Sequence, residues 1–266
     1  MTSPAALQKL VTWLSPAFPV GAFAWSAGLE MAIADRRVTD SARLMSWIEG
    51  ALAHGGIRTD AILLAHAWRA VRETEPAAPP SPTLPARGRV PAGVSGTIAP
   101  QTQSGTSPLA GEDGRGEATI TALSTLADLS LALVSSRERW METTITGDSY
   151  VRAASLWPAE VLARLPQPCP YPIAVGAIAA AHDIDLEDTL LAWLTATVHG
   201  QVSVAIRLVP LGQTDGLRIM SALEPRVAAL AKSAASATLA DIGAIAYAAD
   251  IAQMRHETLE PRIFRS

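Results

Sequence analysis

The sequence predicts an all-α protein: a single helical domain of about eight to ten helices, interrupted by a long, disordered Pro- and Gly-rich insertion. Apolar residues recur at spacings of three and four along most of the chain, and the alternation typical of strands is essentially absent. Hydrophobic residues make up 49% of the 266 residues and charged residues 17%, a balance that allows a substantial buried core.

Two helices are predicted in the first quarter of the chain. One follows Thr39-Asp40, a pair suited to capping, and ends at Gly55-Gly56. Its apolar residues recur every three or four positions: Leu44, Trp47, Ile48, Ala51 and Leu52. The next helix is expected to open at Asp60, and its apolar face would contain Ala61, Leu64, Ala65, Trp68 and Val71.

Three further helices are predicted downstream. One begins near Thr119, and most of its regularly spaced apolar positions are leucines. The longest runs from about Glu187 to Val209, where Pro210 ends it. The last, from about Ala237 to Met254, is rich in alanine, the strongest helix former.

Residues 75–117 have a different composition. Eight of the 19 prolines fall there, together with many Gly, Ser and Thr residues, and no apolar period is present. Such a segment is predicted to be a flexible insertion, because it cannot bury enough apolar surface to order itself. Residues 1–74 and 118–254 would then form one helical domain, and residues 255–266 a C-terminal tail.

Charge and cysteine content exclude several classes of protein. The net charge of −4 is opposite in sign to that of a typical nucleic-acid-binding protein. Cys169 is the single cysteine, so neither an intrachain disulfide nor a cysteine-based metal site can form. The N-terminus has no signal-peptide pattern, and no apolar run reaches 18 residues. We therefore expect a cytoplasmic protein that binds neither nucleic acid nor membrane.

Motifs of enzymes and metal sites are incomplete. The chain contains no G-x-x-x-x-G-K-[ST] loop. His256-Glu257 begins an H-E-x-x-H pattern, but Glu260 stands where the second histidine would be needed. The acidic run that follows His182 lacks the glycine and the final glutamate of an EF-hand, and is better explained as helix capping. We predict no catalytic residue, no metal site and no cofactor.

Three segments have compositions that suit neither a plain helix nor a plain linker. They are S-P-A-F-P-V-G-A-F-A-W-S-A-G-L-E from Ser15, R-L-V-P-L-G-Q from Arg207, and M-R-H-E-T-L-E-P-R-I-F-R-S at the end. The last places Ile263 and Phe264 between two arginines, a pattern typical of a docking peptide. The alternative is that Phe264 folds back onto the protein's own core.

Together, and in this order, the three segments resemble the UreF family of urease accessory proteins, over essentially the whole chain except residues 75–117. The resemblance implies an all-α homodimer without catalytic activity. It also implies two partners: UreD (also called UreH), which binds urease, and the nickel-carrying GTPase UreG. Nickel and GTP would belong to these partners, and the assembly would deliver nickel to the urease apoprotein and control the GTPase cycle of UreG.

The resemblance also implies two sets of partner-binding residues. The candidates for the surface that faces UreG are Glu30, Asp60, Arg137, Glu138 and Arg207. The extreme C-terminal tail typically orders when UreD binds, so the candidates for the UreD side are Arg255, His256, Glu257, Arg262, Phe264, Arg265 and Ser266.

Two other functions stay open from the residues alone. One is a helical enzyme or small-ligand protein with a pocket between helices, which would need converging titratable groups. The other is an Ala-rich helical dimer without a regulated partner, in which removal of the tail would change nothing.

Overall fold

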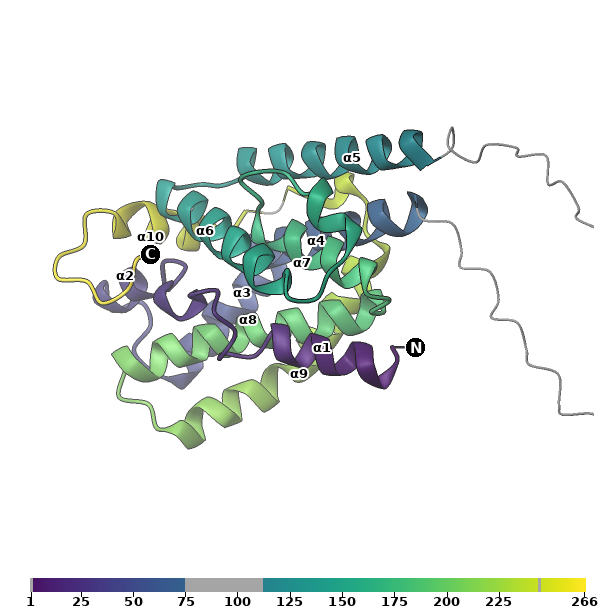
Figure 1. Ribbon diagram of the computed structural model, residues 1–266. Coiled ribbons are helices and arrows are strands. Elements are labelled where there is room, and N and C mark those ends of the chain that lie inside the picture. Colours follow the sequence, from purple (N-terminus) through teal and green to yellow (C-terminus); the bar gives the residue numbers. More distant parts are fainter. Residues whose placement is uncertain (1, 75–111, 244) are drawn as a thin grey trace, which may run out of the picture.

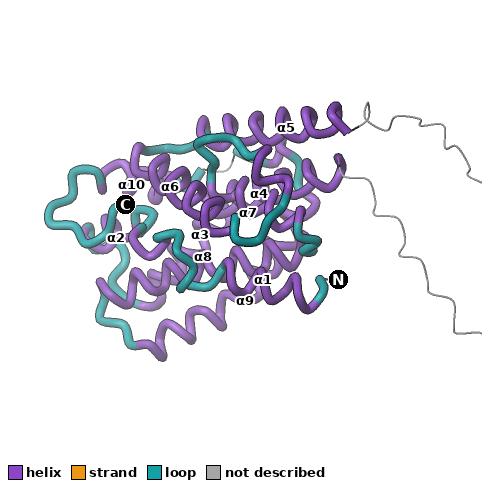
Figure 2. The backbone as a smooth tube through the Cα atoms, viewed as in Figure 1, coloured by secondary structure: helices purple, strands orange, loops and turns teal. Residues whose placement is uncertain are grey.

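The computed structural model describes residues 2–74, 112–243 and 245–266 (Figure 1). Within these ranges the protein is helical throughout, with ten α-helices, three short 3₁₀ helices and no strand (Figure 2). The elements in chain order are α1 (Pro4–Trp13), η1 (Ala22–Ala24), α2 (Leu29–Ala34), α3 (Ser41–His54), α4 (Gly56–Thr74), α5 (Glu112–Ala132), α6 (Arg137–Ala154), η2 (Glu160–Arg164), α7 (Tyr171–Ala181), α8 (Leu186–Leu208), α9 (Gln213–Ser236), η3 (Leu239–Asp241) and α10 (Tyr247–His256).

The centre of the fold is the packing of α4 against α7. Residues 172–180 of α7 are all buried, as expected for a helix that is apolar on every side. Close approach depends on Gly176, because a Cβ atom there would lie 2.2 Å from the Leu64 carbonyl oxygen. The all-α prediction is therefore confirmed, with a buried α-helix at its core.

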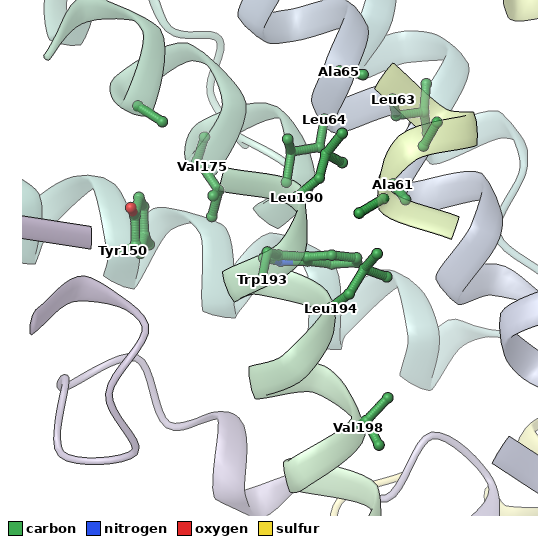
Figure 3. Close-up of a cluster of buried hydrophobic side chains, with 14 of the residues drawn as sticks. Ala61, Leu63, Leu64, Ala65, Tyr150, Val175, Leu190, Trp193, Leu194 and Val198 are labelled. Atoms are coloured by element: carbon green, nitrogen blue, oxygen red, sulfur yellow. The ribbon is translucent and has the colours of Figure 1, made fainter. Parts of the chain in front are cut away.

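The long helix α8 supplies the next layer of the core. Leu190, Leu194 and Val198 repeat every four residues on one buried face, and Trp193 lies beside them (Figure 3). Among the described helices, α8 alone is long and apolar enough to span a membrane by length and composition. In this fold it packs against α9, α4 and α2, which makes it a core helix.

The predicted helix boundaries hold at α3 but not at α4. Asp40 caps α3, since its carboxylate accepts from the Arg43 backbone N–H at 3.0 Å. Helix α4 begins at Gly56, earlier than the expected Asp60. The Gly55 carbonyl accepts from Arg58 N at 3.1 Å, so the chain turns at Gly55 and re-enters a helix at once.

The C-terminal boundary predicted for the insertion, residues 75–117, lies too far along the chain. Residues 75–111 lie outside the described residues, but α5 starts at Glu112, before the expected Thr119. The first turns of α5 pack beside η2, where Gly116 lies next to the Arg164 guanidinium. This tertiary contact explains why the helix extends into a Gly-containing segment.

The predicted helix over Ala237–Met254 is confirmed only in its C-terminal part, where α10 begins at Tyr247. Helix α9 ends at Ser236, and η3 and an irregular segment separate it from α10. The Asp241 carboxylate accepts from the Thr238 backbone N–H at 2.8 Å, which favours a tight turn. Gly243, with φ +137°, adopts a conformation that no helix contains.

Candidate partner-docking site

The C-terminal tail, residues 257–266, folds back along the N-terminal segment that leads into α2, at one end of the molecule (Figure 1). Two backbone hydrogen bonds join the segments: Ser26 N to Ser266 O at 2.7 Å, and Arg265 N to Ala24 O at 2.8 Å. Helix α10 ends at His256. The first two residues of the predicted tail, 255–266, are therefore the last two residues of that helix.

Glu30 lies in the first turn of α2, and its carboxylate binds the tail. Its Oε1 accepts from the Ile263 backbone N–H at 2.7 Å, and its Oε2 accepts from the Phe264 backbone N–H at 2.9 Å. Oε2 also lies 2.8 Å from Nε2 of His256. Glu30 is 5% exposed, so these partners replace the water that an ionised carboxylate would otherwise need.

Glu138, in the first turn of α6, contacts the same histidine from the other side. Its Oε2 lies 2.8 Å from Nδ1 of His256, and its Oε1 accepts from the Arg262 guanidinium at 2.7 Å. His256 is fully buried between the two carboxylates. We refer to Glu30, Glu138, His256 and Arg262 as the tail network.

Two nearby residues support Glu30: Gly28 lets α2 and α10 approach closely, and Ser26 binds the Glu30 backbone. Gly28 has φ +80°, and a Cβ atom there would lie 2.8 Å from the Gln253 backbone nitrogen on α10. Ser26 is fully buried, and its Oγ accepts from the Glu30 backbone N–H at 3.3 Å. The G-L-E motif therefore combines the carboxylate with the glycine that allows its partner helix to reach it.

The tail residues alternate between the core and the surface. Phe264 is buried in the main hydrophobic cluster, with the Arg207 guanidinium 5.7 Å from its ring centroid. Ile263 is 73% exposed, and Arg265 is exposed with its guanidinium 5.9 Å from the centroid of the Trp25 ring. The tail thus presents an apolar side chain flanked by arginines while Phe264 anchors it.

Most of the sequence-predicted site residues meet at this end of the molecule. Glu30, Glu138 and Arg207, assigned to the UreG side, all contact the tail, and the two glutamates are buried. Arg137 is exposed, and its backbone N–H donates to Glu257 at 3.0 Å. Residues predicted for the two partner surfaces therefore contact one another.

The remaining tail-side candidates also have partners in the chain. Arg255, at the end of α10, pairs with Asp35 after α2, with one of the two contacts at 3.1 Å. Ser266 is fully buried, and its Oγ accepts from the Ala27 backbone N–H at 3.2 Å. Asp35 was missed by the sequence analysis, since nothing near it in the sequence distinguishes it from an ordinary surface acid.

Asp60 lies apart from the tail network. Its carboxylate pairs with Arg139, which also contacts Glu142 at 3.0 Å. Burial lowers the pKa of the Arg139 guanidinium, but the two carboxylates outweigh this effect and raise the pKa overall. Arg139 was missed as well, although it directly follows the predicted Arg137-Glu138 pair.

Asp60 and Arg139 line a pocket of about 520 Å³. Thr146 and Trp193 also line it, and their Oγ1 and Nε1 atoms are buried without a hydrogen-bond partner. Among the described residues, no group of three or more His, Cys, Asp and Glu side chains is arranged to hold a metal ion.

Fold and site together define a class: an all-helical protein that presents an anchored C-terminal peptide at one end. Comparison with known proteins identifies the family. The UreF family model matches residues 38–224. The urease accessory protein UreF of Agrobacterium fabrum is 42% identical over 98% of this chain and 97% of its own length. Those of Rhizobium etli CIAT 652 and Rhodopseudomonas palustris BisA53 are 41% and 40% identical over 98% of this chain, and 96% and 94% of their own lengths. The chain belongs to the UreF family.

Proposed function

We propose that this protein is a cytoplasmic, non-catalytic urease accessory protein that helps to insert nickel into the urease apoprotein, with nickel and GTP bound by its partners. Support for a role in urease maturation comes from the family match and from relatives named urease accessory proteins. In this role the protein acts as a scaffold, bridging UreD (UreH) and UreG.

The observation that carries the scaffold proposal is the presentation of the tail. Ile263 points outward while Phe264, its neighbour, is buried, and Glu30 binds the backbone N–H of both. An exposed apolar side chain on a backbone that is already ordered is typical of an interface anchor, because less conformational entropy is lost on binding. Ile263 is the anchor that we assign to UreD.

The UreG side of the proposal rests on fewer residues than the sequence suggested. Arg137 and Arg207 are exposed and can meet a partner directly, whereas Glu30 and Glu138 would act by holding the tail. In this proposal the protein binds UreG and modulates its GTPase cycle. The rate of GTP hydrolysis by UreG, measured with and without this protein, tests that effect.

A second copy of the chain is also a proposed partner. Helix α10 exposes Tyr247, Ile251 and Met254, which recur at spacings of four and three on its outward face. Exposed apolar residues grouped in this way mark interaction surfaces. Light scattering of the wild type and of Ile251→Asp tests the homodimer: a dimer that becomes monomeric on substitution supports this face, and a wild-type monomer contradicts the proposal.

The test of the scaffold is a pull-down with UreD and UreG from the same source. Truncation before Arg255 would also remove the buried His256 and Phe264, so a surface variant, Ile263→Asp, accompanies it. Leu156→Asp is the matched control, because Leu156 is equally exposed but follows the far end of α6. We expect only Ile263→Asp and the truncation to lose UreD. Failure of the wild type to recruit either partner would refute the proposal.

One observation favours a small-ligand protein as the second candidate. The 520 Å³ pocket is lined by Thr146 and Trp193, and each of them carries a buried polar atom that lacks a hydrogen-bond partner. Ligand pockets commonly combine apolar walls with a few such polar groups. Thermal-shift screening of wild type against Thr146→Val distinguishes this function: a ligand that stabilises only the wild type would support it.

A further inference from the structure

His256 has an environment that fixes its proton count. It lies at the end of α10, is fully buried, and has each ring nitrogen 2.8 Å from a carboxylate oxygen. A neutral imidazole carries one N–H, so its second nitrogen would face the lone pair of a carboxylate oxygen. A neutral ring between two ionised carboxylates has a single proton for these two contacts. Two hydrogen bonds of this length therefore require one further proton.

The other partners of the two carboxylates place that proton on the ring. Glu30 already accepts two backbone N–H groups from the tail, and Glu138 accepts from Arg262. Both carboxylates are thus bound by donors, which favours their ionised forms. The extra proton belongs to His256, which is then an imidazolium.

The charges of the tail network balance only in this state. Glu30 from α2 and Glu138 from α6 supply two negative charges, while Arg262 from the tail and protonated His256 supply two positive charges. Loss of the ring proton would leave one carboxylate charge uncompensated and two buried acceptors facing each other, which is strongly unfavourable.

We propose that His256, held as an imidazolium between Glu30 and Glu138, is the positioning residue that fixes the tail in the conformation that docks. Since Glu30 binds the backbone of Ile263 and Phe264, removal of the proton loosens the tail itself. The significance for UreD binding rests on the proposed function, whereas the link between proton and tail does not.

The first measurement is NMR of the ring nitrogens in full-length protein labelled with ¹⁵N-histidine. The His256 signals are assigned by their absence in His256→Gln, and His54→Gln, at an exposed histidine, is the control. We expect both nitrogens of His256 to be protonated near neutral pH. A neutral tautomer at that pH, in the folded protein, would overturn the proposal.

The second measurement is hydrogen exchange at the Ile263 and Phe264 amides. We expect exchange at least about tenfold faster in His256→Gln than in His54→Gln, because a charged hydrogen-bond partner is lost. Equal exchange at these amides in the two variants would contradict a positioning role.

A substitution of one carboxylate separates the proton from simple packing. Glu138→Gln keeps the side-chain volume but removes one negative charge next to the ring, so amide exchange at Ile263 and Phe264 should become faster. Unchanged exchange in this variant would show that packing alone holds the tail. If the ring and tail behave as expected but the wild type does not bind UreD, the proposed function fails while the positioning role of His256 stands.

Discussion

Glu30 and Phe264 lie 234 positions apart in the chain, and the Phe264 backbone N–H donates to Glu30 Oε2 at 2.9 Å. With the bond from Ile263 N to Oε1 at 2.7 Å, both oxygens of one carboxylate hold two consecutive peptide groups. This arrangement fixes which side chain is buried and which is presented. A buried acid on α2 thus determines the outer surface of the tail.

Substitution of Glu30 by glutamine tests that relationship. The amide of glutamine has one acceptor oxygen and places an NH₂ group against a backbone N–H, so at least one bond to the tail must break. We expect the opening free energy of the tail to fall by about 2 kcal/mol, which corresponds to amide exchange on the order of 30-fold faster. Glu257→Gln is the control, because Glu257 is exposed and accepts from a single backbone N–H. Equal exchange in both variants would contradict a special role for Glu30.

Local signals predicted part of this fold. Asp40 was identified as a cap because its type and its place before an apolar period suffice, and Pro210 correctly marked where α8 ends. The break at Gly243 was not predicted, because the alanine content around it favours a helix and the turn at Thr238 depends on a specific side-chain bond.

The four residues of the tail network were named from the sequence, but their geometry was not predictable. The family resemblance drew attention to Glu30, Glu138 and His256, yet nothing local indicates that one histidine lies between two acids from different helices. Sequence periodicity reports which face of a helix is buried and does not report what it is buried against. For this reason the partners of Asp60 and Arg255 were also missed.

Removal of the Asp60 charge should destabilise the whole fold. Asp60→Asn would leave Arg139 buried with Glu142 as its remaining carboxylate partner. Breaking a largely buried pair is expected to lower the free energy of unfolding by about 3 kcal/mol. Glu49→Gln is the comparison, since its pair with Arg226 is more exposed than that of Asp60 with Arg139 and should contribute less than about 1 kcal/mol. Urea unfolding of both variants gives the two values, and equal midpoints would contradict this assignment.

The stability of the protein should fall under mildly acidic conditions, partly through His182. Burial lowers the pKa of this imidazole, as does the nearby Lys9 ammonium, while the Trp157 carbonyl and Asp183 act in the opposite direction. The unfolded chain therefore binds this proton more readily, and the contribution of His182 is complete above its ordinary pKa of about 6.5 and is lost as pH falls through the folded value.

The measurement is chemical unfolding at several pH values below neutral. We expect His182→Gln to show a shallower loss of stability than the wild type as pH falls, and His54→Gln, at an exposed histidine, to follow the wild type. A wild-type slope in His182→Gln would show that other groups carry the acid sensitivity.

Two glycines should tolerate no side chain, because the backbone of another segment lies against their Cα atoms. A Cβ atom at Gly147 would lie 1.9 Å from the Cys169 carbonyl oxygen, and one at Gly176 would lie 2.2 Å from that of Leu64. In both cases the obstacle is backbone, so helices α6 and α4 would have to move away from the segments that they contact. We expect Gly147→Ala and Gly176→Ala each to lower the free energy of unfolding by about 3 kcal/mol or more.

Gly200→Ala is the matched control: Gly200 lies within α8, a Cβ there would meet no atom within 4 Å, and the better helix propensity of alanine should raise stability by about 0.5–1 kcal/mol. Thermal unfolding of the three variants measures these opposite signs. If Gly176→Ala were as stable as Gly200→Ala, α4 and α7 could not be packed as closely as the structure places them.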